Sequence, residues 1–307
     1  MPDKLNRREV LASLATGGVV AAGLTPSTLS AQSAMSAAEE PKLFDSHQHV
    51  ELADGPFSVL DTAALIAKDY EARSRSMDEN GIAQSVLFAA SVYRQANGIE
   101  DTKRVNDLIA TYVSKHSDRF PVGLGIVEMK HGDASLRELE RMARDLKLRG
   151  AAWHHAQCGV AIDHPSMRPI LKTMQELQLV PFMHVHWKPY ESIDRLEVVA
   201  EEFPEITFVA LAAMATREDT EQATQIAKRR KNILFDTGPI VFDREIGIER
   251  FVKRFGADRV LFGSDLYAMQ PSYRKPTTTL EVIRNSHITK EEKALILRGN
   301  VVKLFRL

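Results

Sequence analysis

From residue 43 onward the chain alternates short apolar segments with amphipathic ones, and this alternation limits the fold more than any other feature. The apolar segments are rich in β-branched and aromatic residues, which predicts buried strands. They cover residues 43–50, 84–91, 120–128, 150–155, 179–187, 207–214, 232–237 and 260–266. Strands that are apolar almost throughout are typical of a parallel sheet covered by helices on its outer face.

The amphipathic segments between these strands predict helices. They cover residues 63–80, 102–115, 134–148, 166–178, 192–203, 216–231 and 245–255, followed by a last pair at 278–285 and 290–305. Eight strand–helix units without a linker or a change in composition predict one α/β domain, a (β/α)₈ TIM barrel over residues 41–307.

Composition excludes several classes of protein. The 307 residues are 44% hydrophobic and 26% charged, which suits a single large globular domain. The net charge of −1 gives no basic surface for nucleic acid or an anionic membrane. The single cysteine, Cys158, excludes an internal disulfide framework and a cysteine-rich zinc site. The sequence is compatible with a monomer or a homo-oligomer.

Residues 1–38 carry a different signal. Arg7 and Arg8 precede a mildly apolar run at residues 10–24, and small residues follow it. This pattern predicts a twin-arginine (Tat) export signal with a short linker, cleaved between Ala31 and Ala38. The run is shorter than the ~20 residues that span a bilayer, so we expect no stable membrane insertion. The Tat export machinery would then be a partner of the precursor, and the mature protein would reside in the periplasm.

Histidines cluster where the predicted strands end, which is where TIM barrels carry their chemistry. The residues at these ends are His47, His49, His154, His184, His186 and Asp265, with His155 beside them. A core or surface position explains any one of them, but it explains the set poorly. Imidazole nitrogens and a carboxylate suit zinc with an open coordination position.

Four segments together resemble the amidohydrolase-related branch of the amidohydrolase superfamily. They are Asp45-Ser46-His47-Gln48-His49, Val180-Pro181-Phe182-Met183-His184, the segment from Asp258 to Asp265, and Gly299-Asn300-Val301-Val302-Lys303-Leu304-Phe305. That branch contains decarboxylases, hydratases and lactonases, and the first segment is particularly similar to the lactonases. The resemblance covers residues 42–307.

The resemblance implies a single divalent metal ion held by His47, His49, His184 and Asp265, with zinc expected from the donor atoms. Asp265 would also carry protons. Members with two metals have a lysine on the fourth strand, whereas residues 150–155 here contain none. A second metal is therefore not expected.

The sixth strand departs from the family pattern. Ala213 stands where the family usually has a histidine that handles a proton, and such groups contribute ~10²–10⁴-fold to the rate. His186 follows His184 by two residues, so a continuous strand would place both on one face. His186 is therefore the first candidate for a substitute catalytic residue, and His154 is the second.

The resulting hypothesis is an exported metal-dependent hydrolase that opens an ester, lactone or amide of a small organic acid with metal-activated water. Asp265 and His186 would be catalytic, and the substrate would contact His154, Trp187, Arg94 and Tyr267. One alternative is a decarboxylase of an unsaturated or aromatic carboxylic acid on the same scaffold. Another is a degenerate barrel that binds a small carboxylate or lactone without turnover, which Ala213 would explain.

Overall fold

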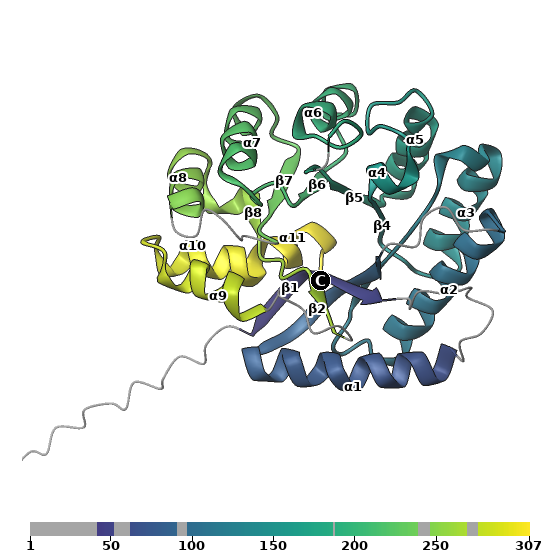
Figure 1. Cartoon of the computed structure of the whole chain (residues 1–307), viewed down its shortest axis with the longest axis horizontal. Coiled ribbons are helices and arrows are strands. Elements are labelled where there is room, and N and C mark those ends of the chain that lie inside the picture. Colours follow the sequence, from purple (N-terminus) through teal and green to yellow (C-terminus); the bar gives the residue numbers. More distant parts are fainter. Residues whose placement is uncertain (1–41, 52–61, 91–96, 187, 239–245, 269–275) are drawn as a thin grey trace, which may run out of the picture. The chain divides into compact units, whose positions relative to one another are not determined.

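The structure, a computed structural model, describes residues 42–51, 62–90, 97–186, 188–238, 246–268 and 276–307. Within these ranges the chain forms the expected (β/α)₈ barrel, with most helices in a ring outside the strands and the last helix, α11 (Asn300–Phe305), inside that ring (Figure 1). No helix in these ranges has the length and apolar character needed to cross a membrane. The predicted export signal lies outside the described residues.

All strands pair in parallel, and neighbours in the sequence are neighbours in the sheet from β1 to β8. The strands are β1 (Leu43–Glu51), β2 (Ile82–Ala90), β3 (Val122–Gly125), β4 (Gly150–Trp153), β5 (Val180–His184), β6 (Phe208–Leu211), β7 (Ile233–Asp236), β8 (Val260–Leu261) and β9 (Leu266–Tyr267). Most are shorter than the apolar segments that predicted them, because those segments continue into the turns at the strand ends.

The last apolar segment closes the barrel, and it does so as two short strands. β8 pairs with β7, whereas β9 pairs with β1. Between them, the Ser46 amide donates to the Phe262 carbonyl (2.7 Å) and the Asp265 amide donates to the His47 carbonyl (2.9 Å). Asp265 itself has a φ of +58°, a left-handed conformation that Asp tolerates better than most residues. The closure therefore brings Asp265 next to His47.

The helices follow the strands as predicted. They are α1 (Thr62–Asn80), α2 (Ile99–Lys115), α3 (Asp133–Arg144), α4 (His155–Cys158), α5 (Met167–Leu177), α6 (Ile193–Glu202), α7 (Arg217–Arg229), α8 (Ile246–Phe255), α9 (Pro276–Asn285), α10 (Lys290–Ala294) and α11 (Asn300–Phe305). A π-helical turn, Leu295–Gly299, joins α10 to α11, so residues 290–305 form one helical segment.

Two apolar clusters follow from the alternation of strand side chains. Side chains that point into the barrel, such as Phe88, Phe182 and Leu211, pack with one another and with Phe305 of α11. The larger cluster lies between the strands and the outer helices and includes Met183. These side chains fill the barrel interior below the strand ends, and the pocket described below lies at the carboxyl-terminal ends of the strands.

Buried polar residues of α1 and α2 hold β1 in place. Arg73 and Asp69 of α1 form a fully buried ion pair (2.8 Å). Arg73 also donates to the Gln48 side chain (3.0 Å) and to the His49 carbonyl (2.7 Å), and Tyr112 donates to Asp69 (2.6 Å). These bonds fix α1 and α2 against the strand that carries both histidines.

Gln48 and Asp45 continue this network to the end of the barrel. Gln48 donates to Asp45 (2.8 Å), which accepts from the Ser264 hydroxyl (2.5 Å) and the Ser264 amide (3.0 Å). Burial raises the pKa of Asp45 to about 6, although these donors lower it. Gln48, which belongs to the segment similar to the lactonases, therefore helps to hold β1 in place.

Candidate metal centre and pocket

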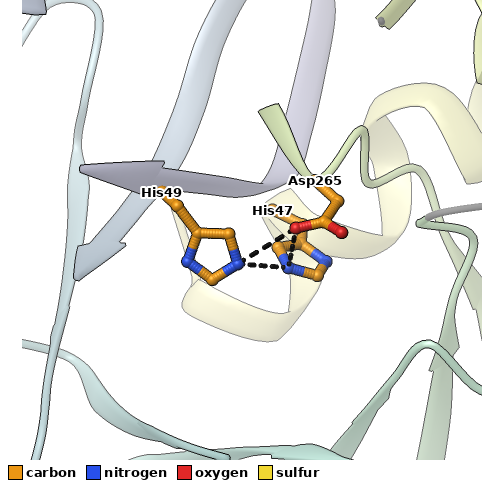
Figure 2. Close-up of side chains that lie close together, drawn as sticks. All are labelled: His47, His49 and Asp265. Atoms are coloured by element: carbon orange, nitrogen blue, oxygen red, sulfur yellow. Dashed lines mark hydrogen bonds and ion pairs between the residues drawn. The ribbon is translucent and has the colours of Figure 1, made fainter. Parts of the chain in front are cut away.

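Two histidines of β1 and the aspartate before β9 converge (Figure 2). The Nε2 atoms of His47 and His49 are 3.0 Å apart. Oδ1 of Asp265 lies 3.4 Å from Nε2 of His47 and 3.1 Å from Nε2 of His49. The histidines share one face because strand side chains alternate, and the closure of the barrel supplies the aspartate.

The spacing of these three atoms fits a metal ion. Two ligands about 2.1 Å from one ion lie about 3.0–3.4 Å apart when their angle at the ion is between 90° and 109°. The three separations between these atoms fall in that range. Two nitrogens and a carboxylate oxygen suit zinc and are also accepted by other divalent ions.

Asp236 at the end of β7 orients His47. Its Oδ1 lies 2.8 Å from Nδ1 of His47, and its Oδ2 accepts from the Ser46 hydroxyl (3.0 Å). When Nδ1 donates to a carboxylate, Nε2 is left as the ligand atom. Burial alone lowers the pKa of His47, but the charges of Asp236 and Asp265 outweigh it and raise the pKa. This imidazole therefore lies in a negative field that favours a cation.

Gly263 is needed for this arrangement. A Cβ on Gly263 would lie 1.9 Å from Oδ2 of Asp236 and 2.7 Å from the Cβ of His47. Only glycine therefore lets the last segment pass so close to the residues that orient the site.

His49 lies in a more apolar environment. Its ring is 4.6 Å from the ring of Phe88 and 4.7 Å from that of Tyr267. Burial lowers the pKa of His49 to about 4. The imidazole is therefore neutral near pH 7 and available as a ligand.

A second group contains His154, His184 and Glu191. The rings of His154 and His184 stack with centroids 4.3 Å apart and planes 12° from parallel. Oε1 of Glu191 lies 2.6 Å from Nδ1 of His154, and Oε2 lies 2.5 Å from Nδ1 of His184. Burial raises the pKa of Glu191, but these hydrogen bonds outweigh it and lower the pKa to about 2.

The histidines of both groups, together with Asp265, line one pocket at the carboxyl-terminal ends of the strands. Its space is about 620 Å³ with the open mouth included. The lining residues are His47, His49, Phe88, Ala89, Ala152, Trp153, His154, Gln157, His184, Leu211, Ala212, Asp265 and Tyr267. The structure therefore brings His154 and Tyr267 to the pocket as expected, while Arg94 and Trp187 lie outside the described residues.

His186 lies just beyond the end of β5. β5 ends at His184, and Nδ1 of His186 lies 2.8 Å from Oδ2 of Asp219. Asp219 also belongs to the capping box that begins α7. Val185 packs in the same outer cluster as Met183, and the ring centroids of His184 and His186 are 6.4 Å apart, so the alternation of side chains continues past the end of β5. His186 is not among the described residues that line the pocket, and its catalytic role stays a prediction.

Ala213 does not lie in the pocket, where the family comparison of the sixth strand would place it. β6 ends at Leu211, and Ala212 has a φ of +58°, which interrupts the alternation of side chains. Leu211 and Ala212 line the pocket, whereas Ala213 packs in the cluster between strands and helices. A histidine at residue 213 would therefore place its imidazole in the apolar cluster between strands and helices.

Sequence reasoning missed Asp236 and Glu191. Asp236 ends a predicted strand, so the rule that selected His47, His49 and Asp265 also applied to it. Glu191 lies in a segment without strand or helix, seven residues after His184. No periodic pattern marks such a residue, and only its burial and its two histidine partners reveal it.

A parallel barrel with a histidine–carboxylate metal centre at the carboxyl-terminal ends of its strands defines a class of metal-dependent enzyme. Within this class the chain belongs to the amidohydrolase family, whose family model matches residues 44–307. The sequence-based assignment to the amidohydrolase-related branch is confirmed.

Similar proteins include several decarboxylases. The chain is 26% identical over 152 residues to a gamma-resorcylate decarboxylase of Rhizobium, which covers 42% of this chain and 46% of that protein. The chain matches less than half the length of the curated relatives.

Solved structures share the fold over most of the chain. The 5-carboxyvanillate decarboxylase of Sphingomonas paucimobilis has a TM-score of 0.65 and 17% identity, covering 87% of this chain and 99% of that one. The enzyme of that name from Novosphingobium aromaticivorans, solved with manganese and 4-hydroxy-3-methoxy-5-nitrobenzoic acid, has a TM-score of 0.65 and 16% identity. It covers 86% of this chain and 96% of that one. At these identities the likeness supports the fold.

Proposed function

We propose that this protein is a metal-dependent decarboxylase of a small aromatic or unsaturated carboxylic acid. The convergence of His47, His49 and Asp265 at metal-ligand spacing carries the proposal. The choice of reaction rests on the relatives, because the curated proteins and several structures that resemble the chain are decarboxylases. Decarboxylation, the alternative hypothesis from the sequence, is therefore preferred to hydrolysis.

In this proposal His47, His49, Asp265 and His184 hold one divalent ion, and zinc fits the donor set. The ion would supply positive charge that holds the oxygen atoms of the substrate. Manganese is the ion in the Novosphingobium structure, so the activity of this protein should be measured with zinc and with manganese.

The residues of the chain have distinct roles in the reaction. Asp265 delivers a proton to the carbon that bears the carboxylate, the bond to that carboxylate breaks, and carbon dioxide leaves. Water then returns a proton to Asp265. Phe88, Leu211 and Tyr267 give the pocket apolar walls for a flat ring. Arg94 and Trp187 follow β2 and β5 in the sequence, and we retain them as substrate contacts, with Arg94 paired to a carboxylate.

Hydrolysis of an ester, lactone or amide remains the second candidate. The same three-ligand centre supports it, because a divalent ion activates water as well as it holds a carboxylate. His186 belongs to this candidate as a proton carrier. Its hydrogen bond to Asp219 fixes one ring nitrogen, so such a role would use the other.

The products of the reaction separate the candidates. Protein loaded with zinc or with manganese is expected to release carbon dioxide from 2,6-dihydroxybenzoate or 5-carboxyvanillate, and Asp265→Asn should lower the rate about 10²–10⁴-fold. Carbon dioxide is measured by a coupled assay and the aromatic product by mass spectrometry. A lactone product heavier by one water, or cleavage of an ester into its acid and alcohol, would favour the hydrolase. An intact metal site without turnover in either panel would favour a binding protein.

We further propose that residues 1–38 direct the protein to the periplasm by the twin-arginine route. A reporter fused after residue 40 should reach the periplasm, and export should be lost when both Arg7 and Arg8 are changed to Lys. Cell fractionation measures the location. Export that survives the double change would indicate a general secretory signal, and stable membrane retention would mean that the segment is not cleaved.

A further inference from the structure

We propose that Glu191 is a positioning residue that sets the tautomer and the orientation of His154 and His184 together. The inference rests on the proposed function in one respect, that His184 is counted as a ligand of the metal. It assigns no chemistry to Glu191 itself, whose carboxylate is fully buried behind the two imidazoles.

The contacts of Glu191 leave it little freedom. Oε1 accepts from the backbone amide of Ala156 (2.8 Å) and lies 2.6 Å from Nδ1 of His154. Oε2 lies 2.5 Å from Nδ1 of His184. A carboxylate accepts hydrogen bonds and donates none, so each Nδ1 must carry a proton. Each Nε2 is then an acceptor, which is the state of an imidazole that binds a metal.

The short distances in this group fit hydrogen bonds rather than the spacing of ligands around a second metal ion. Two ligands of one ion lie about 3.0–3.4 Å apart, whereas charge-assisted hydrogen bonds are about 2.5–2.9 Å long. The separations at Glu191 are 2.5 and 2.6 Å, and those between His47, His49 and Asp265 are 3.0 to 3.4 Å. The two groups therefore differ in kind, although both contain histidine and carboxylate.

The stacked rings make the two imidazoles a unit. His154 follows β4 and His184 ends β5, and their planes are within 12° of parallel. One carboxylate that bonds both Nδ1 atoms holds both Nε2 atoms on the opposite edge of the stack. The arrangement matches that of Asp236 behind His47. Two carboxylates, Asp236 and Glu191, therefore each bond the Nδ1 side of the imidazoles that face the pocket from β1, β4 and β5.

Histidine nitrogen NMR on the purified protein tests the inference without any substrate. The wild-type protein should show His154 and His184 with the proton on Nδ1, with signals assigned by their loss in His154→Gln and His184→Gln. In Glu191→Gln the amide offers one acceptor and one donor, so at least one of the two rings should change tautomer. Affinity for zinc should fall about 10–100-fold, as for other residues that orient a metal ligand.

Glu138→Gln is the matched control. Glu138 is also a buried glutamate, but its partners are Asn106 and Arg141 on α2 and α3. This variant should leave the tautomers of His154 and His184 and the zinc affinity unchanged. Wild-type protein with either proton on Nε2, or Glu191→Gln with both tautomers and zinc affinity unaltered, would overturn the inference. The wild-type spectrum decides even when Glu191→Gln does not fold, and neither result depends on decarboxylation.

Discussion

Replacing His47 by Ala is expected to abolish stable metal binding and to lower turnover about 10³-fold. His47 supplies one of three ligand atoms that lie 3.0–3.4 Å apart, and its own geometry is fixed by Asp236. A metal stabilises the transition state by several kcal/mol, and each 1.4 kcal/mol is worth about tenfold in rate. Metal content by elemental analysis and turnover on the best substrate measure the two effects.

A variant with a smaller expected effect and a surface control test this prediction further. Asp236→Asn keeps the ligands but weakens the bond to Nδ1 of His47, so metal affinity should fall about 10–100-fold. The control is His287→Ala, because the His287 side chain is 90% exposed and bonds only Glu249 among the described residues. His287→Ala should keep both metal and turnover. Full metal content in His47→Ala would show that the centre is elsewhere.

Asp69→Ala is expected to lower the free energy of unfolding by about 3–5 kcal/mol, since it leaves the Arg73 charge buried without its carboxylate. Arg73 and Asp69 are both fully buried. Arg73 would retain only neutral partners among the described residues, namely Gln48, the His49 carbonyl and Tyr112, and Tyr112 would lose its carboxylate acceptor. Urea denaturation of the metal-free protein measures the loss without a contribution from bound metal.

The same helix provides the control. Glu71 and Arg75 form a pair of the same spacing in α1, but their side chains are 75% and 66% exposed. Glu71→Ala should change stability little, because solvent screens such pairs. The double variant Asp69→Leu, Arg73→Met should recover part of the loss, since it removes the unpaired charge. Equal effects of Asp69→Ala and Glu71→Ala would contradict the structural role assigned to this network.

The fold followed from the sequence because the barrel repeats one pattern eight times. Each buried strand had to be apolar along its length, and each outer helix had to be amphipathic. The ends of the strands were less predictable. The apolar segment 207–214 contains no turn signal, yet β6 ends at Leu211 because Ala212 adopts a positive φ. Alanine does not favour that conformation, so the residue type gave no sign of it.

Part of the candidate site could likewise be predicted from the sequence, and part could not. His47, His49 and Asp265 were identified because the fold alone brings strand ends together. Glu191 was missed because its role depends on two imidazoles from different strands, which no spacing along the chain reveals. The bond between His186 and Asp219 of α7 was also missed, because it joins residues 33 positions apart in the chain.

Anomalous diffraction from a crystal of the zinc-loaded protein tests the central claim most directly. The account predicts one peak per chain, about 2.0–2.2 Å from Nε2 of His47, Nε2 of His49 and a carboxylate oxygen of Asp265, with His184 as a further ligand through Nε2. A peak bonded to Nδ1 of His154 and His184, a second peak in the pocket, or no peak at His47 and His49 would contradict it.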